Sequence, residues 1–278
     1  MILSDLIKAA IKEDMPQGDV TTESLGLLPQ QGKAVLKAKE DLILSGLLPF
    51  ENTMMMVEPS LKIKWNFEEG QLILKNQNIC SLEGDLLRIL KAERVALNFL
   101  GHLSGIATYT HKFVNAVKGT HTVILDTRKT LPAYRDLEKK AVVHGGGMNH
   151  RMNLSSAILL KDNHIAIMGG ITPAVKRVRQ NSELKIEVEV ATLDQVKEAV
   201  SLAVNRILLD NMTNEMMTEA KRLTPPGIET EASGNMSLDR VAAVAAIGID
   251  YISVGALTHS APVADISLQF EWKKNVPS

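Results

Sequence analysis

The sequence predicts an α/β protein with two domains: one built on an antiparallel sheet, followed by an open, incomplete α/β barrel of six or seven strands. Six short apolar runs between Thr122 and Gly255 each end at a polar or charged residue, and helix-length segments separate them. Such continuous runs are typical of strands buried on both faces, as in parallel sheets. The first hundred residues instead contain alternating apolar and polar stretches, which favour an antiparallel sheet with one wet face.

The antiparallel sheet is expected before residue 85. Its strand-like stretches are 33–39, 42–45, 61–67 and 71–75. From Asp85 onward, leucine and alanine recur at helical spacing. Ser104-Gly105 predicts a break in this pattern, before a second helix that runs toward Val117.

The change of pattern also places the domain boundary. We expect an N-terminal domain over 1–108 and the barrel domain over 109–267. The tail, 268–278, carries Phe270 and Trp272 after the last barrel element, so we expect it to pack back on the first domain.

The barrel strands are expected to end near residues 126, 161, 190, 210, 232 and 255. Six such units are fewer than the eight of a closed barrel, so the barrel is expected to be open, with either six strands or a seventh that the pattern does not locate. Thr192, Thr213 and Ser237 stand where N-caps of the connecting helices belong.

Composition limits the class of partner. The formal net charge of -1 gives no general attraction to nucleic acid or to anionic membranes. A single cysteine, Cys80, permits no intrachain disulfide, and no zinc-like spacing of cysteine and histidine occurs. The longest late apolar run, Val241 to Ile249, is too short to span a bilayer. We therefore expect a cytoplasmic protein with no nucleic-acid or membrane partner.

The ends of the apolar runs collect cations and a few carboxylates. Ligands of parallel α/β proteins bind at the carboxyl ends of strands. Between Asp126 and Arg151 there are six Lys or Arg against three acids. This local surplus predicts a pocket for a polyanionic substrate rather than a surface stripe.

Two of these cationic motifs also have a structural interpretation. Arg128-Lys129 alone could be a solvated loop. Lys161 is in register with a buried strand, where a cation is costly unless an anion meets it. That anion could be a substrate, or an internal salt bridge to Asp126 or Asp210 could satisfy the lysine.

The run Gly145-Gly146-Gly147 lacks the spacing of a phosphate-binding loop, so we interpret it as a flexible turn that presents His150 and Arg151. Among the histidines, His150 and His259 stand beside strand-end motifs and are the better candidates for a site.

Glu187 and Glu189 alternate along one strand and are expected on the same side of it, facing either the barrel interior or the helix layer. A carboxylate at the barrel mouth can stabilise positive charge developing on a sugar carbon.

Ten motifs, in order along nearly the whole chain, resemble those of the quinolinate phosphoribosyltransferase family. They are Glu13-Asp-Met-Pro-Gln-Gly-Asp-Val-Thr-Thr22, Glu93-Arg-Val-Ala-Leu-Asn98, Leu103-Ser-Gly-Ile-Ala-Thr108, Asp126-Thr-Arg-Lys-Thr130, Gly145-Gly-Gly-Met-Asn-His-Arg151, Lys161-Asp-Asn-His164, Glu187-Val-Glu-Val190, Leu209-Asp-Asn-Met212, Glu231-Ala-Ser-Gly234 and Ser253-Val-Gly-Ala-Leu-Thr-His259. Ten motifs together are far more specific than any one alone.

The resemblance implies a fold and a reaction. The family fold is an N-terminal α/β sandwich domain followed by an open α/β barrel. The reaction joins quinolinate to phosphoribosyl pyrophosphate and gives nicotinate mononucleotide, pyrophosphate and carbon dioxide. Magnesium accompanies the pyrophosphate, and no tightly bound organic cofactor is implied. A homodimer is also implied, in which Arg94 enters the barrel of the other subunit.

The resemblance further implies roles for single residues. The carboxylates of quinolinate would be held by Arg128, His150, Arg151 and Lys161. Lys129, Lys161, Glu189 and Asp210 form the implied catalytic set, with Glu189 and Asp210 near the ribose and indirectly near the metal. The implied substrate-binding set is Arg94, Thr127, Arg128, Lys129, His150, Arg151, Lys161, Glu189, Asp210, Ser233, Gly234, Asn235, Ser253, Val254, Gly255 and His259. Within it, Ser233-Gly234 and Gly255-Ala256 would offer backbone N–H groups to the 5'-phosphate.

The sequence departs from the family pattern at three places. Ala133 follows Pro132 where the family usually has glycine, so the freedom of glycine to adopt positive φ is lost. Asn235 replaces a common glycine, although asparagine tolerates left-handed geometry better than most residues. Ser156 replaces a frequent aspartate.

Three other functions are alternatives. A relative on the same fold, found with molybdate transport genes, would take another acceptor. A Schiff-base aldolase would use Lys161 or Lys129. A ligand sensor on a barrel scaffold would catalyse nothing.

Overall fold

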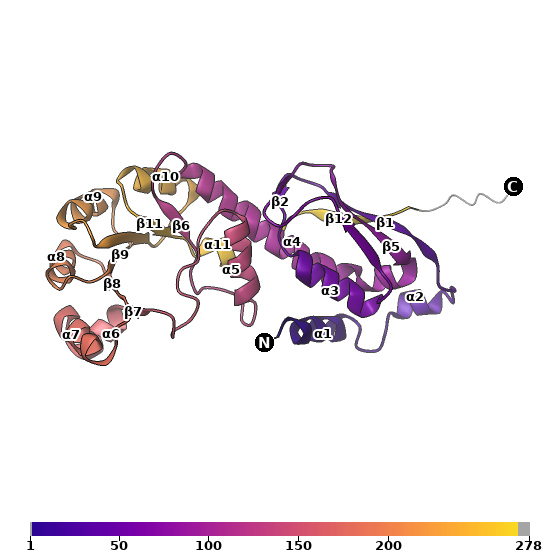
Figure 1. Cartoon of the computed structure of the whole chain (residues 1–278), viewed down its shortest axis with the longest axis horizontal. Helices are drawn as coiled ribbons and strands as arrows, with labels where there is room; N and C mark the ends of the chain where they lie inside the picture. The colour runs from indigo at the N-terminus through magenta and orange to yellow at the C-terminus, as the bar shows by residue number, and fades with distance from the viewer. Residues whose placement is uncertain (1, 272–278) are drawn as a thin grey trace. The chain divides into compact units, whose positions relative to one another are not determined.

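The computed structural model describes residues 2–271 (Figure 1). The chain divides into two compact units. The first unit contains residues 2–109, 131–146 and 261–271, and the second contains 110–130 and 147–260. The sequence-based domain limits stay predictions, and the segment 131–146 lies in the first unit although it falls within the expected barrel domain.

The first unit is built on a four-stranded antiparallel sheet with strand order β12-β1-β5-β3. Its strands are β1 (Gln31–Ala38), β3 (Lys62–Trp65), β5 (Asn78–Asp85) and β12 (Ile266–Glu271). The first and last strands of the chain are therefore neighbours, in register from Lys33 with Glu271 to Ala38 with Ile266 (Figure 1). Trp272, which belongs to the expected tail, lies outside the described residues.

The other elements of this unit are helices and two short strands, and the two strands pair with each other in a separate antiparallel sheet. These elements are α1 (Leu3–Asp14), α2 (Val20–Ser24), β2 (Leu42–Ile43), α3 (Leu47–Val57), β4 (Leu72–Ile73) and α5 (Arg135–His144). The alternation along β1 places Ala34, Leu36 and Ala38 in the core and leaves the residues between them part-exposed or exposed. Phe50 of α3 is fully buried in the same core. An antiparallel sheet with one wet face, as expected from the alternation, is confirmed.

A single helix, α4 (Leu86–Ala116), runs for 31 residues through the position where the sequence predicts a break. That prediction is wrong, and the two residues that suggested it make contacts instead. A Cβ added at Gly105 would lie 2.0 Å from the carbonyl oxygen of Pro262, so the glycine permits close packing. Ser104 lies in the core, where its hydroxyl donates to the carbonyl of Ser45 and accepts from the N–H of the same residue.

The second unit is built on a six-stranded parallel sheet with strand order β6-β11-β10-β9-β8-β7. Its strands are β6 (Val123–Leu125), β7 (Ile158–Leu160), β8 (Ile186–Val190), β9 (Arg206–Asp210), β10 (Glu229–Ser233) and β11 (Tyr251–Ser253). The predicted open α/β barrel is confirmed, and the strand ends agree with the predicted ones to within two residues. Beyond β6, an isolated parallel bridge joins Leu125 to Met148, so the seventh position holds a bridge in place of a named strand.

Helices follow the strands of this sheet (Figure 1). They are α6 (Asp162–Met168), α7 (Ile171–Asn181), α8 (Leu193–Ser201), α9 (Asn214–Leu223), α10 (Leu238–Ala246) and α11 (Ala256–His259). Thr192 caps α8 in a reciprocal pair with Gln195, and Thr213 accepts the N–H of Met216 at the start of α9. Ser237 also stands at an N-cap position, where its side chain makes no capping hydrogen bond. Within the described part of the chain, no helix is both long and apolar enough to cross a membrane.

Candidate active site

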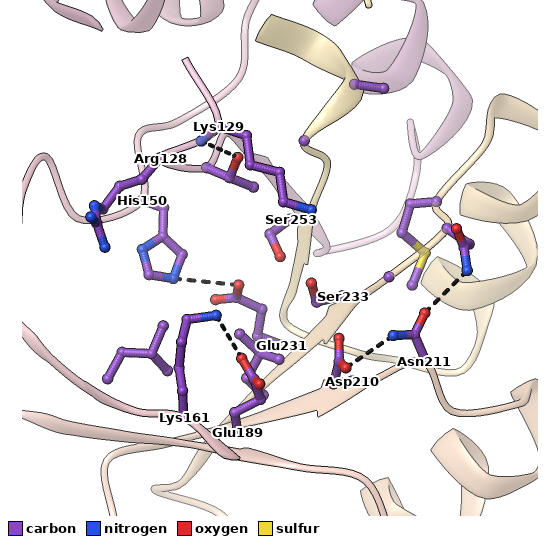
Figure 2. A pocket seen from close by; sticks show the side chains of 18 of the residues that line it. Arg128, Lys129, His150, Lys161, Glu189, Asp210, Asn211, Glu231, Ser233 and Ser253 are labelled. Atoms are coloured by element: carbon purple, nitrogen blue, oxygen red, sulfur yellow. Dashed lines mark hydrogen bonds and ion pairs between the residues drawn. The ribbon is translucent and has the colours of Figure 1, made fainter. Parts of the chain in front are cut away.

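A cavity of about 710 Å³ lies at the carboxyl ends of the parallel strands in the second unit (Figure 2). Each of the six strands contributes to its wall through its last residues or the loop that follows. The predicted site residues that line it are Thr127, Arg128, Lys129, His150, Arg151, Lys161, Glu189, Asp210, Ser233, Gly234, Asn235, Ser253, Gly255 and His259. The sequence pattern therefore located the cavity, because parallel strands bring their carboxyl ends to one edge.

Two guanidinium groups in this cavity lack an anionic partner among the described residues. The Nε of Arg128 is buried and has no hydrogen-bond acceptor. Burial and the nearby charge of Arg128 lower the pKa of Arg151 below its ordinary value. Buried donors are nearly always paired in native structures, and two neighbouring cations repel each other. An anionic ligand would accept a hydrogen bond from Arg128 and would offset the repulsion between the two arginines.

The loop after β6 is anchored to α11, the short helix that follows β11. The hydroxyl of Thr258 donates to the carbonyl of Lys129 at 2.7 Å. A Cβ added at Gly255 would lie 3.1 Å from the Cδ of Lys129, so glycine leaves room for the lysine side chain. This contact holds Lys129 in the cavity wall.

Lys161, which follows β7, forms an ion pair with Glu189 of β8, with its Nζ 2.9 Å from Oε2 (Figure 2). The sequence pattern suggested Asp126 or Asp210 as the partner of an internal salt bridge of Lys161. That expectation is wrong, because the partner is Glu189. Asp126 is fully buried and accepts the backbone N–H of His150 instead. The Lys161 side chain is 46% exposed, so the cost expected for a buried cation does not apply.

His150 lies against two buried carboxylates from the strands below the cavity. Its Nε2 is 3.3 Å from Glu187 Oε2 and 3.5 Å from Glu231 Oε1, and its Nδ1 accepts the N–H of Arg151. Glu231 is fully buried, and its other oxygen accepts from Arg206 at 2.9 Å. Glu187, Glu231 and His150 are called the carboxylate–histidine cluster below.

The cluster changes the acidity of its members. Burial alone would lower the pKa of His150, but the hydrogen bond to Glu187 and the charges of Glu231 and Glu187 raise it above its ordinary value. Burial, followed by the charge of Glu187, raises the pKa of Glu231 to about 7. Two close carboxylates do not both ionise readily in a buried site, so the cluster favours the retention of a proton.

The wall at the ends of β9 and β10 is built from small and amide side chains. Gly234 has a φ of 91°, and a Cβ there would lie 2.2 Å from Oδ1 of Asn211. Asn235 has a φ of 51° and donates from its side chain to the same oxygen at 3.2 Å. The expectation that Asn235 tolerates left-handed geometry is confirmed. Asn211 in turn donates to Asp210, so hydrogen bonds connect the three side chains of this wall.

Comparison with known proteins identifies the family. The family model described as quinolinate phosphoribosyl transferase, C-terminal domain, matches residues 106–269, and the model for the N-terminal domain of the same family matches residues 19–104. The chain belongs to the quinolinate phosphoribosyl transferase family. The resemblance inferred from the ten motifs is confirmed.

Individual relatives agree along the full length. The chain is 40% identical over 274 residues to a probable nicotinate-nucleotide pyrophosphorylase [carboxylating] of Synechocystis sp., covering 97% of this chain and 92% of the relative. It is 39% identical to the chloroplastic nicotinate-nucleotide pyrophosphorylase [carboxylating] of Arabidopsis thaliana, covering 97% and 83%. The solved structure of the nicotinate-nucleotide pyrophosphorylase from Francisella tularensis superposes with a TM-score of 0.93 at 36% identity, covering 97% and 96%.

Some cations and site residues predicted for this family member lie outside the cavity. Arg94 is an exposed residue of α4, and Val254 is buried below the surface. Of the six cations between Asp126 and Arg151, only Arg128, Lys129 and Arg151 line the cavity. The other three, Arg135, Lys139 and Lys140, lie on α5 in the first unit. The prediction that the local cationic surplus lines a pocket is therefore correct for only three of the six residues.

Sequence reasoning also missed part of the wall. The cavity residues that we did not predict are Leu159, Leu208, Asn211, Glu231 and Met236, whereas Ala256 lines the cavity beside Gly255 as the resemblance implied. Glu231 and Asn211 belong to motifs that carry the family resemblance, and this was the signal that could have identified them. Arg206, which holds Glu231, begins its strand rather than ending it, so the strand-end rule excluded it.

The departures of this chain from the family pattern have structural outcomes. Ala133 has a φ of 64°, so it adopts the left-handed conformation that a glycine would adopt without a penalty. The turn at residues 145–147, expected to present His150 and Arg151, follows α5, and Gly146 has a φ of 90°. Ser156 donates to the carbonyl of Asn153 within an exposed turn.

Proposed function

We propose that this protein transfers the phosphoribosyl group of phosphoribosyl pyrophosphate to quinolinate with decarboxylation. The products are nicotinate mononucleotide, pyrophosphate and carbon dioxide, which makes the protein a pentosyltransferase of NAD biosynthesis. The single observation that carries the proposal is a cavity with unpaired cations in a chain of this family. Full-length relatives named quinolinate phosphoribosyltransferase [decarboxylating] support it.

The acceptor side of the cavity is assigned to Arg128, His150, Arg151 and Lys161. Arginine suits bidentate recognition of a carboxylate, whereas lysine suits a point contact. The unpaired Nε of Arg128 and the repulsion between Arg128 and Arg151 favour a ligand with two negative groups. Quinolinate, a pyridine with two adjacent carboxylates, has this charge distribution.

The donor side is assigned to Lys129, Glu189 and Asp210. In the reaction the bond from the sugar carbon to pyrophosphate breaks, and the pyridine nitrogen bonds to that carbon. Positive charge develops on the sugar carbon, and the carboxylates of Glu189 and Asp210 would stabilise it. Lys129 would bind the departing phosphates.

Magnesium fits this donor side as a companion of pyrophosphate. The ion prefers oxygen ligands and commonly binds through one or two carboxylates together with substrate phosphates. Asp210 and Glu189 offer such oxygens in the cavity wall, although each already pairs with Asn211 or Lys161. They would therefore act on the ion indirectly. When bound, magnesium would neutralise part of the negative charge of the pyrophosphate.

The 5'-phosphate is assigned to the wall formed by Ser233, Gly234 and Asn235, together with Gly255 at the start of α11. Backbone N–H groups that face a cavity bind phosphate because they are fixed dipoles. Thr127, Ser253, Val254 and His259 complete the proposed substrate-binding set.

The proposal includes a homodimer in which Arg94 completes the site of the other subunit. Mixing inactive Arg94→Ala subunits with inactive Arg128→Ala subunits should restore part of the activity, because a mixed dimer holds one intact site. Proven subunit exchange without recovery would contradict the shared site. The cytoplasmic location stays a prediction from the sequence.

The test of the function is carbon dioxide release from carboxyl-labelled quinolinate. Release should require phosphoribosyl pyrophosphate and a divalent cation, and nicotinate should be a far poorer acceptor. Equal use of nicotinate, or release without the donor, would overturn the proposal. The same assay excludes a non-catalytic sensor and a relative with another acceptor.

The Schiff-base alternative has less support. A lysine that forms such adducts is usually activated by desolvation or by a neighbouring cation. Lys161 is half-exposed and paired with a carboxylate. Borohydride trapping with an aldehyde or ketone should therefore leave the protein unmodified.

A further inference from the structure

Arg240, in the first turn of α10, joins the two loops that form the wall at the ends of β9 and β10. Its guanidinium donates to the carbonyl of Met212 at 2.6 Å and to the carbonyl of Gly234 at 3.2 Å. Met212 belongs to the loop after β9, and Gly234 belongs to the loop after β10. Gly234 lines the cavity, whereas Arg240 and Met212 are not among the described residues that line it. Arg240 therefore holds this wall from behind.

The same two loops are also joined on the cavity side. The backbone N–H of Asn211 donates to the carbonyl of Ser233 at 3.0 Å, and the side chain of Asn235 donates to that of Asn211 at 3.2 Å. Asn211, Gly234 and Asn235 have positive φ values of 52°, 91° and 51°. Left-handed backbone is unfavourable for a residue with a side chain, so it persists only where surrounding contacts hold it. The hydrogen bonds of Arg240 and of the two asparagines are such contacts.

The hydrogen bond to Gly234 also sets the direction of a donor in the wall. A peptide unit is planar and trans, so its carbonyl and its N–H point in opposite directions. The Gly234 carbonyl points to Arg240, and the N–H of Asn235 in the same peptide unit therefore points away from Arg240, toward the cavity that Asn235 lines. Hydrogen bonds in a chain polarise one another, so a cation on the carbonyl makes this N–H a better donor.

We propose that Arg240 is a positioning residue for the phosphate group of the sugar. It directs the N–H of Asn235 into the cavity, where a phosphate oxygen accepts it, and it keeps the loops after β9 and β10 together. The ligand recognised in this way is a phosphomonoester of ribose, and Arg240 itself does not touch it. The inference deepens the proposed function and rests on it, since that function assigns the 5'-phosphate to this wall.

The chain offers a matched control in Arg179 of α7. Arg179 also donates to the carbonyl of a residue with positive φ, Ala203, at 2.9 Å. Ala203 lies between α8 and β9, before the strand begins, whereas the cavity lies at the carboxyl end of that strand. Arg179→Met therefore removes a comparable contact at the opposite end of β9, and a general effect of losing such a contact would appear in both proteins.

Two variants of Arg240 separate its hydrogen bonds from its packing. Arg240→Met keeps the apolar stem of the side chain and removes every donor. Arg240→Lys keeps the positive charge but replaces the planar fork with a single ammonium group, which does not reproduce the two fixed hydrogen bonds. The lysine variant should therefore recover part of what the methionine variant loses.

The first measurement compares the two substrates in steady-state kinetics. In Arg240→Met, KM for phosphoribosyl pyrophosphate should rise about tenfold or more, because the hydrogen bonds that orient the phosphate donor are lost. The 5'-phosphate does not change during the reaction, so kcat should stay nearly constant, and so should KM for quinolinate. Arg179→Met should behave as the wild type does. An unchanged KM for phosphoribosyl pyrophosphate, or an equal loss for both substrates as expected of a purely structural residue, would overturn the inference.

Direct binding separates this inference from the proposed function. Ribose 5-phosphate, which carries the phosphate but no pyrophosphate, is titrated into each protein by calorimetry. It should bind the wild type and Arg179→Met alike, and Arg240→Met about tenfold or more weakly. No binding to the wild type, or equal binding to all three, contradicts the inference. If quinolinate is not decarboxylated but ribose 5-phosphate shows this selective loss, the proposed function fails and the role of Arg240 stands. If quinolinate is decarboxylated without the selective loss, the inference alone fails.

A third measurement needs no variant of Arg240. In wild-type protein with ¹⁵N-labelled asparagine, the backbone signal of Asn235, assigned by its absence in Asn235→Gly, should shift when ribose 5-phosphate is added. A signal that stays in place while ribose 5-phosphate binds would mean that the phosphate lies elsewhere, and the inference would be wrong.

Discussion

The two larger sheets of this protein differ in what they bury. The antiparallel sheet of the first unit covers an apolar core that includes Leu36, Phe50 and Leu82. The carboxylate that β5 buries at its end, Asp85, accepts two backbone N–H groups. The parallel sheet of the second unit buries Glu187 and Glu231 as well as its valines and leucines. Apolar burial stabilises a fold, whereas buried carboxylates cost free energy unless they are paired. The comparison indicates that the first sheet mainly stabilises the fold. The second sheet lowers the stability of the fold to some degree, because it buries the carboxylates that its cavity uses.

The largest effect expected from this contrast is loss of stability at the first core. Phe50→Ala should lower the free energy of unfolding by about 3–5 kcal/mol, because it removes a fully buried ring. Urea unfolding measures it, with the exposed Leu48→Ala on the same helix as the control. The activity per folded molecule should be unchanged. If Phe50→Ala lowered the free energy of unfolding by less than about 1 kcal/mol, the claim that the first sheet mainly stabilises the fold would be wrong.

The next effect is on catalysis in the second unit. Arg128→Ala should lower kcat/KM for quinolinate by about 10²–10³-fold, since it removes charge-assisted hydrogen bonds to a carboxylate. Stability should change little, because relief of the repulsion with Arg151 offsets lost packing. Arg177→Ala, at an exposed position of α7, is the control. Wild-type kinetics in Arg128→Ala would contradict the assignment.

A smaller effect tests the glycine within α4. Gly105→Ala should destabilise the protein by about 1–3 kcal/mol, because the new Cβ would meet the Pro262 carbonyl oxygen at 2.0 Å. Alanine has a higher helix propensity than glycine, so without the close contact Gly105→Ala would stabilise the protein. The sign of the change in the free energy of unfolding therefore shows whether packing or helix propensity dominates. The exposed Asn98→Ala in the same helix controls for helix propensity. A stabilised Gly105→Ala protein would show that close packing is not the reason for this glycine.

The smallest effect concerns the ends of the barrel helices. Thr192→Ala should cost about 1 kcal/mol, because it removes the hydroxyl that accepts the N–H of Gln195. Ser237→Ala should cost clearly less, since the Ser237 side chain makes no capping hydrogen bond. Thermal unfolding of both variants gives the comparison. Equal losses would mean that the caps contribute through backbone geometry alone.

The sequence predicted the second unit better than the first. Its parallel strands are continuous apolar runs with a polar end, a local signal that locates both the strand and the site residue after it. In contrast, β5 was not predicted, because it lies between β1 and β3 and has a burial pattern that does not alternate. The break at Ser104-Gly105 was predicted wrongly because the partner of Gly105, Pro262, is distant in the sequence.

The same limit applies within the site. Arg128, Lys129 and Lys161 were identified by their positions after strands. The partners of His150 were not, since no local pattern shows that Glu187 and Glu231 face one imidazole from two different strands. Sequence position indicates which side chains reach the cavity, whereas their charge states depend on neighbours that only the folded sheet brings together.

The open form of the barrel leaves β7 at one edge of the parallel sheet. An edge strand exposes unpaired N–H and C=O groups, which can recruit a strand from another molecule and start aggregation. β7 is only three residues long, Ile158–Leu160, and the next residue already carries the charge of Lys161. So short a ladder, ended by a cation, is a poor template for intermolecular pairing. The residue that we assign to substrate binding therefore also protects the solubility of an unclosed barrel.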